Sequence, residues 1–340
     1  MELSRLRLKP LLGAIVAAVT LLSGATPALA AAYVVDTTSD NGALTACTGA
    51  AADCSLRGAL LIANVSQGVA DTITFDPAVF LSGAPATITI GSSLTTVFLA
   101  GPLTIDGTGA GVIVDGAGEP SAFDCLDVNG PHTVRDLQIT DCTIGIDLVV
   151  NGTAGPGNLI YDNTTGIRAQ GSGALIDGNF IGTNAAGTAV HPSGGNGTGV
   201  NITGSSNTIG SPGGIPGAAN LISGNTGNGV AVSGDSNLFK GNKIGISACC
   251  PAVAVPNGGD GILITGGANN IIGGSTMFVE GNLLSGNSGD GVEITGGSGT
   301  VIKGNQIGVH SGFADMGNTG AGVFVSGAAV NTTIGGTATT

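Results

Sequence analysis

Short apolar-x-apolar segments, each preceded by a glycine, recur along the chain at nearly constant intervals. The seven glycines are Gly145, Gly166, Gly199, Gly229, Gly261, Gly291 and Gly322. Successive glycines are separated by about 30 residues, apart from the shorter first interval between Gly145 and Gly166. Apolar residues on both sides of a variable one are typical of a short strand with one buried face. Because repeats of about 20 to 50 residues are typical of stacked coils, the pattern predicts a solenoid rather than a globule.

A longer motif repeats at twice this interval. The segment Gly178–Gly182 returns as Gly241–Gly245 and as Gly304–Gly308, each 63 residues further on. We divide each such unit, which we call a doublet, into two coils of three strands, and so predict an all-β, single-stranded parallel β-helix of about nine or ten coils. The second residue of each copy is Asn179, Asn242 or Asn305. Stacked asparagines of this kind predict internal amide ladders between coils.

The first part of the chain has a different pattern. Residues 33–35 predict a first strand, and residues 54–64 predict a helix with Asp53 or Ser55 as its N-cap. Short, irregular strands are expected over 73–75, 87–90, 103–105 and 112–114. The helix has one apolar face, formed by Leu56, Ala59, Leu60 and Ala63. We expect that face to cover the apolar end of the first coil, which would otherwise leave strand edges open.

The helical segment carries a family resemblance. Cys54–Ala59 reads Cys-Ser-Leu-Arg-Gly-Ala and is followed by Ala63-Asn64 and by Asp71–Phe75. Over about residues 33–75 this resembles the CSLREA domain, a module of exported bacterial proteins that precedes right-handed parallel β-helix repeats of the pectin-lyase-like type. Gly58 stands where the family has Glu, which predicts a helix weaker by about 1 kcal/mol and an Arg57 without that partner. The resemblance implies export and a right-handed β-helix, but no catalytic residues.

The segment 1–30 is typical of a secretory signal peptide. Basic residues precede an apolar run from Leu11 to Leu22, and Ala28–Ala30 offers small residues for cleavage. The run is short for a membrane span, and we expect no integral membrane segment after cleavage. The predicted organisation is therefore a signal peptide (1–30), a capping segment (31–75) and β-helix repeats (76–340), in a protein that acts outside the cell or at its surface.

The charge of the chain limits the classes of partner that it can bind, and its cysteine content predicts disulfides. The chain has 22 acidic and nine basic residues, and without the signal peptide 21 and six remain, a formal charge of −15. Such a balance argues against nucleic acid as a partner. Six cysteines in an exported chain favour disulfides over metal binding. The candidate pairs are Cys47 with Cys54 and Cys125 with Cys142, while Cys249 and Cys250 either bond each other or remain free.

The middle residue of each short strand points outward, so stacking the coils produces one surface stripe. Its predicted members are Asp127, Asp147, Arg168, Asn201, Ala231, Leu263, Glu293 and Phe324. Asp127, Asp147 and Arg168 would be neighbours, with Asp124, Arg135, Asp136 and Asp141 close in sequence. Clustered carboxylates beside a cation suit acid/base or Ca²⁺-assisted cleavage of polysaccharide. The alternative, which we favour, is solvated aspartates paired with arginine across coils.

A second column precedes each repeat glycine and contains Asp260 and Asp290. Two stacked carboxylates together with backbone carbonyls could hold Ca²⁺. The alternative is a pair of solvated turn aspartates, since Gly-Asp-Gly favours a turn by itself. No other cofactor is expected.

These observations favour a non-catalytic, exported β-helix that is structural or adhesive, or that binds carbohydrate or another cell-surface ligand. The alternative is a polysaccharide lyase or glycoside hydrolase that acts through Asp127, Asp147 and Arg168. An enzyme would need loops that wall a groove over those residues, whereas the visible insertions, such as 248–259, lie mainly C-terminal to them. The repeat pattern persists to 334–336 without a capping motif, which predicts either further chain beyond Thr340 or end-to-end self-association.

Overall fold

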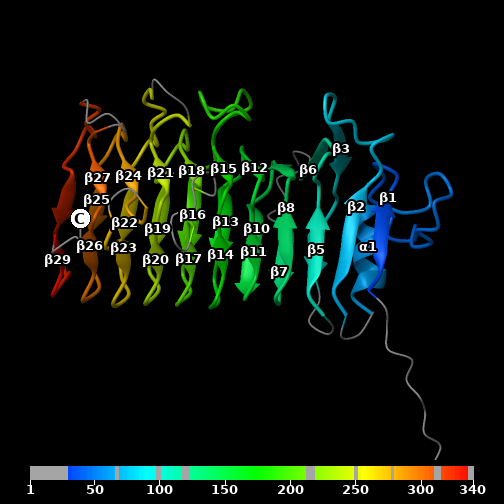
Figure 1. The fold of residues 1–340 in the computed structure, drawn as a ribbon, viewed down its shortest axis with the longest axis horizontal. Coiled ribbons are helices and arrows are strands. Elements are labelled where there is room, and N and C mark those ends of the chain that lie inside the picture. Colours follow the sequence, from blue (N-terminus) through cyan, green and yellow to red (C-terminus); the bar gives the residue numbers. More distant parts are fainter. Residues whose placement is uncertain are drawn as a thin grey trace, which may run out of the picture.

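The computed structural model describes residues 30–65, 69–96, 101–116, 123–211, 219–248, 252–276, 279–309 and 315–335. Its strands run in turn through three parallel sheets, so that three strands complete one coil and each strand pairs with the strand one coil away. The chain is an all-β, right-handed parallel β-helix, and Figure 1 shows its coils stacked side by side along the long axis. The predicted fold class is confirmed.

Sheet A has eleven strands, and sheets B and C have nine each. Sheet A comprises β1 (Ala32–Val35), β2 (Asp71–Phe75), β5 (Leu103–Asp106), β8 (Thr133–Arg135), β11 (Thr153–Ala154), β14 (Leu175–Ile176), β17 (Thr208–Ile209), β20 (Leu238–Phe239), β23 (Ile271–Gly273), β26 (Val301–Lys303) and β29 (Thr333–Ile334). Sheet B comprises β3 (Ala86–Thr89), β6 (Val112–Asp115), β9 (Gln138–Thr140), β12 (Leu159–Ile160), β15 (Phe180–Ile181), β18 (Leu221–Ile222), β21 (Lys243–Ile244), β24 (Leu283–Leu284) and β27 (Gln306–Ile307). Sheet C comprises β4 (Leu94–Thr96), β7 (Asp124–Asn129), β10 (Ile144–Val150), β13 (Thr165–Ala169), β16 (Thr198–Ile202), β19 (Val230–Val232), β22 (Ile262–Ile264), β25 (Val292–Ile294) and β28 (Val323–Val325).

The core is a continuous column of aliphatic side chains enclosed by the three sheets. One coil, for example, buries Val200 from sheet C, Ile209 from sheet A and Ile222 from sheet B, all without solvent exposure. Alternate residues of each strand point outward, because successive side chains of a strand face opposite sides. The apolar-x-apolar pattern therefore records the inner and outer faces of the solenoid.

Asparagine ladders run along two corners of the solenoid. In each, a side-chain amide donates to the carboxamide oxygen of the next asparagine at 2.8–3.0 Å. One ladder contains Asn158, Asn179, Asn220, Asn242, Asn282 and Asn305, and the other contains Asn163, Asn196, Asn225, Asn257, Asn287 and Asn318. The predicted ladder exists, but Asn220 separates Asn179 from Asn242, because each doublet contributes two coils. Most of these amides are buried, and the ladder satisfies their hydrogen-bonding groups.

The helix α1 (Leu56–Ala63) lies beside β1 and β2 at the first coil (Figure 1), where the sequence predicted it. Ser55 is the N-cap, and its hydroxyl accepts the Gly58 N–H at 2.9 Å. A Cβ on Gly58 would lie 2.0 Å from the backbone oxygen of Leu44, so the Glu of the CSLREA motif would not fit in this backbone. Arg57, which has no Glu of the motif beside it, forms an ion pair with Asp40 at 2.9 Å instead.

Short β-hairpins extend from alternate coils at the corner between sheets B and C. Isolated antiparallel bridges define them: Thr183 with Val190 after β15, Ile246 with Ala254 after β21, and Val309 with Asp315 after β27. The intervening strands β18 and β24 are followed by short turns instead. The hairpins after β15 and β21 touch across the plain coil between them, since the Ala248 N–H donates to the Gly187 oxygen at 2.7 Å.

Disulfides join Cys47 to Cys54 and Cys125 to Cys142, the two pairs proposed from the sequence. Cys249 and Cys250 lie outside the described residues, as do nearly all of the predicted signal peptide and the last five positions of the chain. Within the described ranges, no helix is long and apolar enough to span a membrane.

Candidate functional site

The outward stripe of sheet C has the register that the sequence predicted. Asp127 pairs with Asp147, Asp147 with Arg168, and Arg168 with Asn201 on successive strands. The stripe continues through Ala231, Leu263, Glu293 and Phe324. Neighbouring strands of a sheet lie about 4.8 Å apart, so side chains on adjacent strands are close enough for direct contact.

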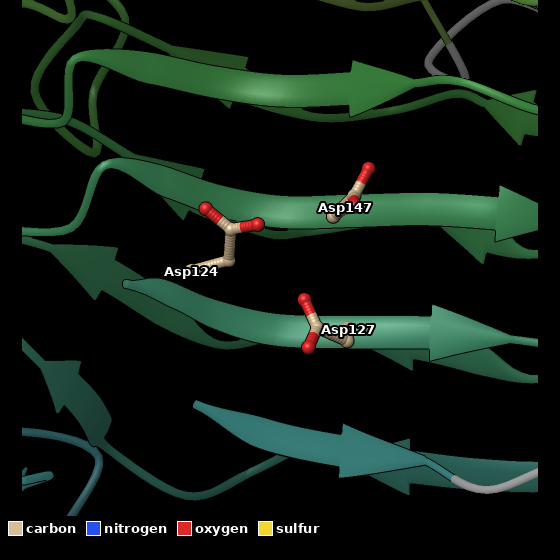
Figure 2. A group of neighbouring side chains, drawn as sticks. All are labelled: Asp124, Asp127 and Asp147. Atoms are coloured by element: carbon tan, nitrogen blue, oxygen red, sulfur yellow. The ribbon is translucent and has the colours of Figure 1, made fainter. Parts of the chain in front are cut away.

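Three carboxylates gather at the start of this stripe, and with Arg168 we call them the Arg168 cluster. Figure 2 shows Asp127 on β7, Asp147 on the next strand, β10, and Asp124 beside them. Oxygen atoms of the three carboxylates all lie within 4.8 Å of one another. The structure thus brings together the two predicted carboxylates and adds Asp124.

Arg168 holds this cluster together. Its Nε donates to Asp147 Oδ1 at 3.0 Å, and its Nη2 donates to Asp147 Oδ2 at 2.6 Å and to Asp124 Oδ2 at 3.2 Å. Gln170 Nε2 adds a further hydrogen bond to Asp147 Oδ2 at 2.6 Å. Asp147 is only 2% exposed, so its carboxylate is covered and engaged by three donor contacts.

The electrostatics follow from this geometry. Burial raises the pKa of Asp124, and the nearby Asp127 and Asp147 raise it further, whereas the positive charge of Arg168 opposes them. The hydrogen bonds to Asp147 raise the pKa of Arg168, because they stabilise its charged form.

The other charged residues close in sequence do not join this cluster. Arg135 lies on β8 of sheet A and pairs with Asp106 of β5. Asp136 and Asp141 lie at two different corners, before and after β9. Within one coil a few residues are enough to move the chain from one sheet to another, so closeness in sequence does not imply closeness on a face.

A second group of carboxylates lies further along sheet C and consists of Asp260, Asp290 and Glu293; we call it the Glu293 cluster. Their oxygen atoms also lie within 4.8 Å of one another. The predicted column of Asp260 and Asp290 is present, but Glu293 of the outward stripe, which the prediction placed in a separate column, completes the group. Asp260 Oδ1 accepts the Asp290 N–H at 2.7 Å, and Asp290 Oδ1 accepts the Ala321 N–H at 2.5 Å.

The pKa of Glu293 is raised, first by its hydrogen bond with the Asp260 carboxyl group, then by burial and by the negative charges of Asp260 and Asp290. Three carboxylates in this arrangement offer the hard oxygen ligands that Ca²⁺ prefers. The hydrogen bonds to backbone N–H groups also account for the positions of Asp260 and Asp290 as stacked turn residues, without an ion.

The hairpins do not enclose the Arg168 cluster. The hairpins between sheets B and C follow β15, β21 and β27, whereas the cluster lies on β7, β10 and β13. These three hairpins therefore lie C-terminal to the cluster, as the sequence indicated for most of the insertions, while the described loops at 36–55 and 76–85 precede it. Residues 117–122, which connect β6 to β7, are outside the described part of the chain.

Comparisons with known proteins give distant structural neighbours. The A-module of mannuronan C-5 epimerase AlgE4 from Azotobacter vinelandii is 15% identical with a TM-score of 0.41, and the alignment covers 82% of this chain and 89% of the module. The A-module of AlgE6 from the same organism is 16% identical with a TM-score of 0.30, covering 79% and 81%. No protein-family model matches, so the CSLREA resemblance has no independent support. No curated protein matches either. Similarity at this level transfers neither a reaction nor a residue assignment.

Proposed function

We propose that this chain is an exported, non-catalytic β-helix whose long sheet faces bind carbohydrate at the cell surface or outside the cell. A signal-peptide-like start, two disulfides and an excess of acidic residues support export. Stacked coils supply an extended surface with a regular spacing, which suits an extended polymer.

The observation that carries the non-catalytic assignment is the state of Asp147. Cleavage of a glycosidic bond by a carboxylate pair requires both groups to reach the substrate. Here Arg168 and Gln170 occupy both oxygens of Asp147, and the side chain is almost fully covered. With these three hydrogen bonds, Asp147 forms an ion pair with Arg168 that links two coils, and it is not an exposed acid/base group.

The alternative is a polysaccharide lyase or glycoside hydrolase that acts through Asp127, Asp147 and Arg168. The close approach of three carboxylates and the raised pKa of Asp124 favour it, since a general acid must hold a proton near the working pH. In that mechanism Asp124 would protonate the leaving oxygen, and Asp127 would act as the second carboxylate.

A single screen separates the two functions. The chain from Ala31 onward is incubated with a panel of neutral and acidic polysaccharides, with and without Ca²⁺, and is followed by co-sedimentation, reducing ends and unsaturated products. We expect binding to at least one polymer without product. Product formation that disappears in Asp127→Asn or Asp124→Asn would make the protein an enzyme and overturn the proposal, as would failure to bind any polymer.

A further inference from the structure

An open cavity of about 450 Å³ lies on the outer face of sheet A, away from both carboxylate clusters. It is lined by Thr104, Thr133, Arg135, Thr153, Gly155, Pro156, Leu175 and Asp177. Its volume falls in the range of about 300–1,000 Å³ that is usual for small-molecule sites. These residues come from four neighbouring strands, β5, β8, β11 and β14, and the turns that follow them.

One side of the cavity is a row of threonine hydroxyl groups. Thr104 pairs with Thr133, and Thr133 pairs with Thr153, on three successive strands of sheet A. Their side chains are partly exposed, whereas the alternate residues Ile105, Val134 and Ala154 are buried in the core. The row therefore presents a hydroxyl group about every 4.8 Å along the solenoid axis.

Toward the N-terminus the row continues with Thr72 of β2, which pairs with Thr104, whereas toward the C-terminus it ends at the cavity. Thr153 is followed on the next strands by Leu175, Thr208, Leu238 and Ile271. Beyond the cavity the same stripe is therefore mostly aliphatic. Hydroxyl groups, an arginine and a carboxylate occur together on this face only where the cavity lies, among the described residues.

Gly155 lines the cavity between the two charged residues, Arg135 and Asp177. It follows Ala154 of β11, on the strand between those that carry Arg135 and Asp177. A Cβ on Gly155 would lie 1.7 Å from the Asp177 backbone oxygen, and the φ angle of Gly155 is +118°, so glycine is required there. Gly155 therefore lines the cavity without a side chain between Arg135 and Asp177, which lie about 10 Å apart along the axis.

Arg135 and Asp177 form no ion pair with each other across the cavity. Arg135 turns toward Asp106 on the preceding strand, and its side chain remains 40% exposed. The Asp177 carboxylate receives no hydrogen bond from the described residues, and burial raises its pKa without any opposing contribution from Arg135. A half-buried carboxyl group without a donor requires a partner from solvent or from a ligand.

We propose that this cavity is a binding subsite for a neutral, hydroxyl-rich sugar unit of an extended saccharide. The threonine hydroxyls and the Asp177 carboxyl group would pair with sugar hydroxyls, Arg135 would donate to a further oxygen, and Pro156 with Leu175 would contact an apolar ring face. A uronate is disfavoured, because Asp106, Asp136 and Asp177 outnumber the single cation Arg135 at this place. The inference rests on the proposed carbohydrate-binding function and assigns its site and ligand class.

The test uses calorimetric titration with cellohexaose, mannohexaose, xylohexaose and maltohexaose, and with a galacturonate hexamer as the acidic probe. The variants are Thr133→Val with Thr153→Val, and Asp177→Asn. Thr208→Val is the matched control, because it lies on the same stripe beyond the cavity. Far-UV circular dichroism and urea unfolding establish that each variant is folded.

We expect at least one neutral hexasaccharide to bind with a Kd below about 1 mM, and the galacturonate hexamer to bind at least about tenfold more weakly. The double valine variant and Asp177→Asn are each expected to raise the Kd roughly 3- to 10-fold, and Thr208→Val to leave it unchanged. Polymer binding that survives in the cavity variants would overturn this site while leaving the proposed function intact. Tighter binding of galacturonate would overturn the ligand class, and absence of binding to every probe and polymer would overturn both proposals.

Discussion

The Arg168 and Glu293 clusters both bring three carboxylates together on one sheet, but they stabilise this negative charge differently. Each gathers three carboxylates with oxygen atoms within 4.8 Å, and each lies on the outer face of sheet C. The Arg168 cluster receives a cation from the strand that follows its second aspartate. In the Glu293 cluster the corresponding strand contributes Phe324, and no ion pair with a described residue is present.

The difference shows in how each cluster balances its charge. Asp147 is covered and bound to a guanidinium group, which raises the pKa of Arg168. The Glu293 cluster instead shares hydrogen bonds among its carboxyl groups and with backbone N–H groups, and the carboxyl contact raises the pKa of Glu293. The repeated backbone therefore fixes which side chains come together, and a single residue on the next coil decides whether they form an ion pair or a group of hydrogen-bonded carboxyls without a cation.

The largest effect is expected when the cation is removed. Arg168→Met leaves the covered Asp147 and the neighbouring Asp124 without their ion pair, and removal of one member of a buried pair costs about 3 kcal/mol. Urea unfolding at neutral pH measures the loss. Lys303→Met is the control, since Lys303 forms no ion pair with a described residue, and we expect it to change stability by less than about 0.5 kcal/mol. Equal stabilities of Arg168→Met and Lys303→Met would show that the ion pair of Arg168 with Asp147 contributes nothing to the stability of the fold.

A smaller effect is expected when one carboxylate is neutralised. Asp147→Asn keeps the shape of the side chain but weakens the hydrogen bonds to Arg168 and Gln170, with an expected loss of about 1–2 kcal/mol. Asp127→Asn is the matched control on the preceding strand, and the hydrogen bonds of Arg168 to Asp147 and Asp124 do not involve it. Its neutralisation also reduces the repulsion that it exerts on Asp124, so its destabilising effect is expected to be smaller than that of Asp147→Asn. The reverse order of the two variants would contradict the central role of Asp147.

A third substitution would give the Glu293 cluster a cation like that of the Arg168 cluster. Phe324 follows Glu293 on the next strand as Arg168 follows Asp147, and it is 47% exposed. Phe324→Arg is expected to stabilise the fold by about 0.5 kcal/mol at low salt, the size usual for an exposed ion pair. Phe324→Gln controls for loss of the aromatic ring. A gain that persists at high salt, or that Gln reproduces, would exclude the ion pair as its cause.

The smallest effect is expected in how the stability of the fold depends on pH. Because the pKa of Glu293 is raised from 4.5, the folded chain binds more protons than the unfolded chain as the pH rises above that value, and stability falls through this window. Glu293→Gln is expected to flatten that fall. Glu280 has the opposite sign, since its pKa of about 2 makes the folded chain lose stability as the pH falls below 4.5. Urea unfolding measured at pH values above and below 4.5 tests both pH dependences. If stability falls with rising pH as steeply in Glu293→Gln as in the unchanged chain, the role assigned to Glu293 is wrong.

The sequence predicted the stripe of sheet C and the asparagine ladder because both follow from one periodicity. Once the apolar positions of each short strand are aligned, the register of Asp127, Asp147 and Arg168 is determined. The two carboxylate clusters were less predictable. Glu293 and Asp290 belong to different columns in the sequence, and they meet only because the turn brings the residue before the glycine beside the outward position of the strand.

The cavity of sheet A was missed for a related reason. A threonine row is easiest to recognise as Thr-x-Thr within one strand, whereas Thr104, Thr133 and Thr153 lie one per strand on three successive coils. Aligning every coil, including the irregular early ones, would have revealed the row. The role of Gly58 had no such signal, because its lack of a side chain is required by a backbone oxygen of the loop at Leu44.

From β15 onward, the alternation of hairpin-bearing and plain coils limits how this protein can change length in evolution. The hairpins after β15 and β21 meet across one plain coil, and loss of that single coil would place two hairpins on neighbouring coils. Gain or loss of a whole doublet preserves both the alternation and the asparagine ladders. Proteins built on this plan are therefore expected to differ by whole doublets, as in unequal crossing-over between tandem copies. A relative that differs by one coil and keeps adjacent hairpins would contradict this expectation.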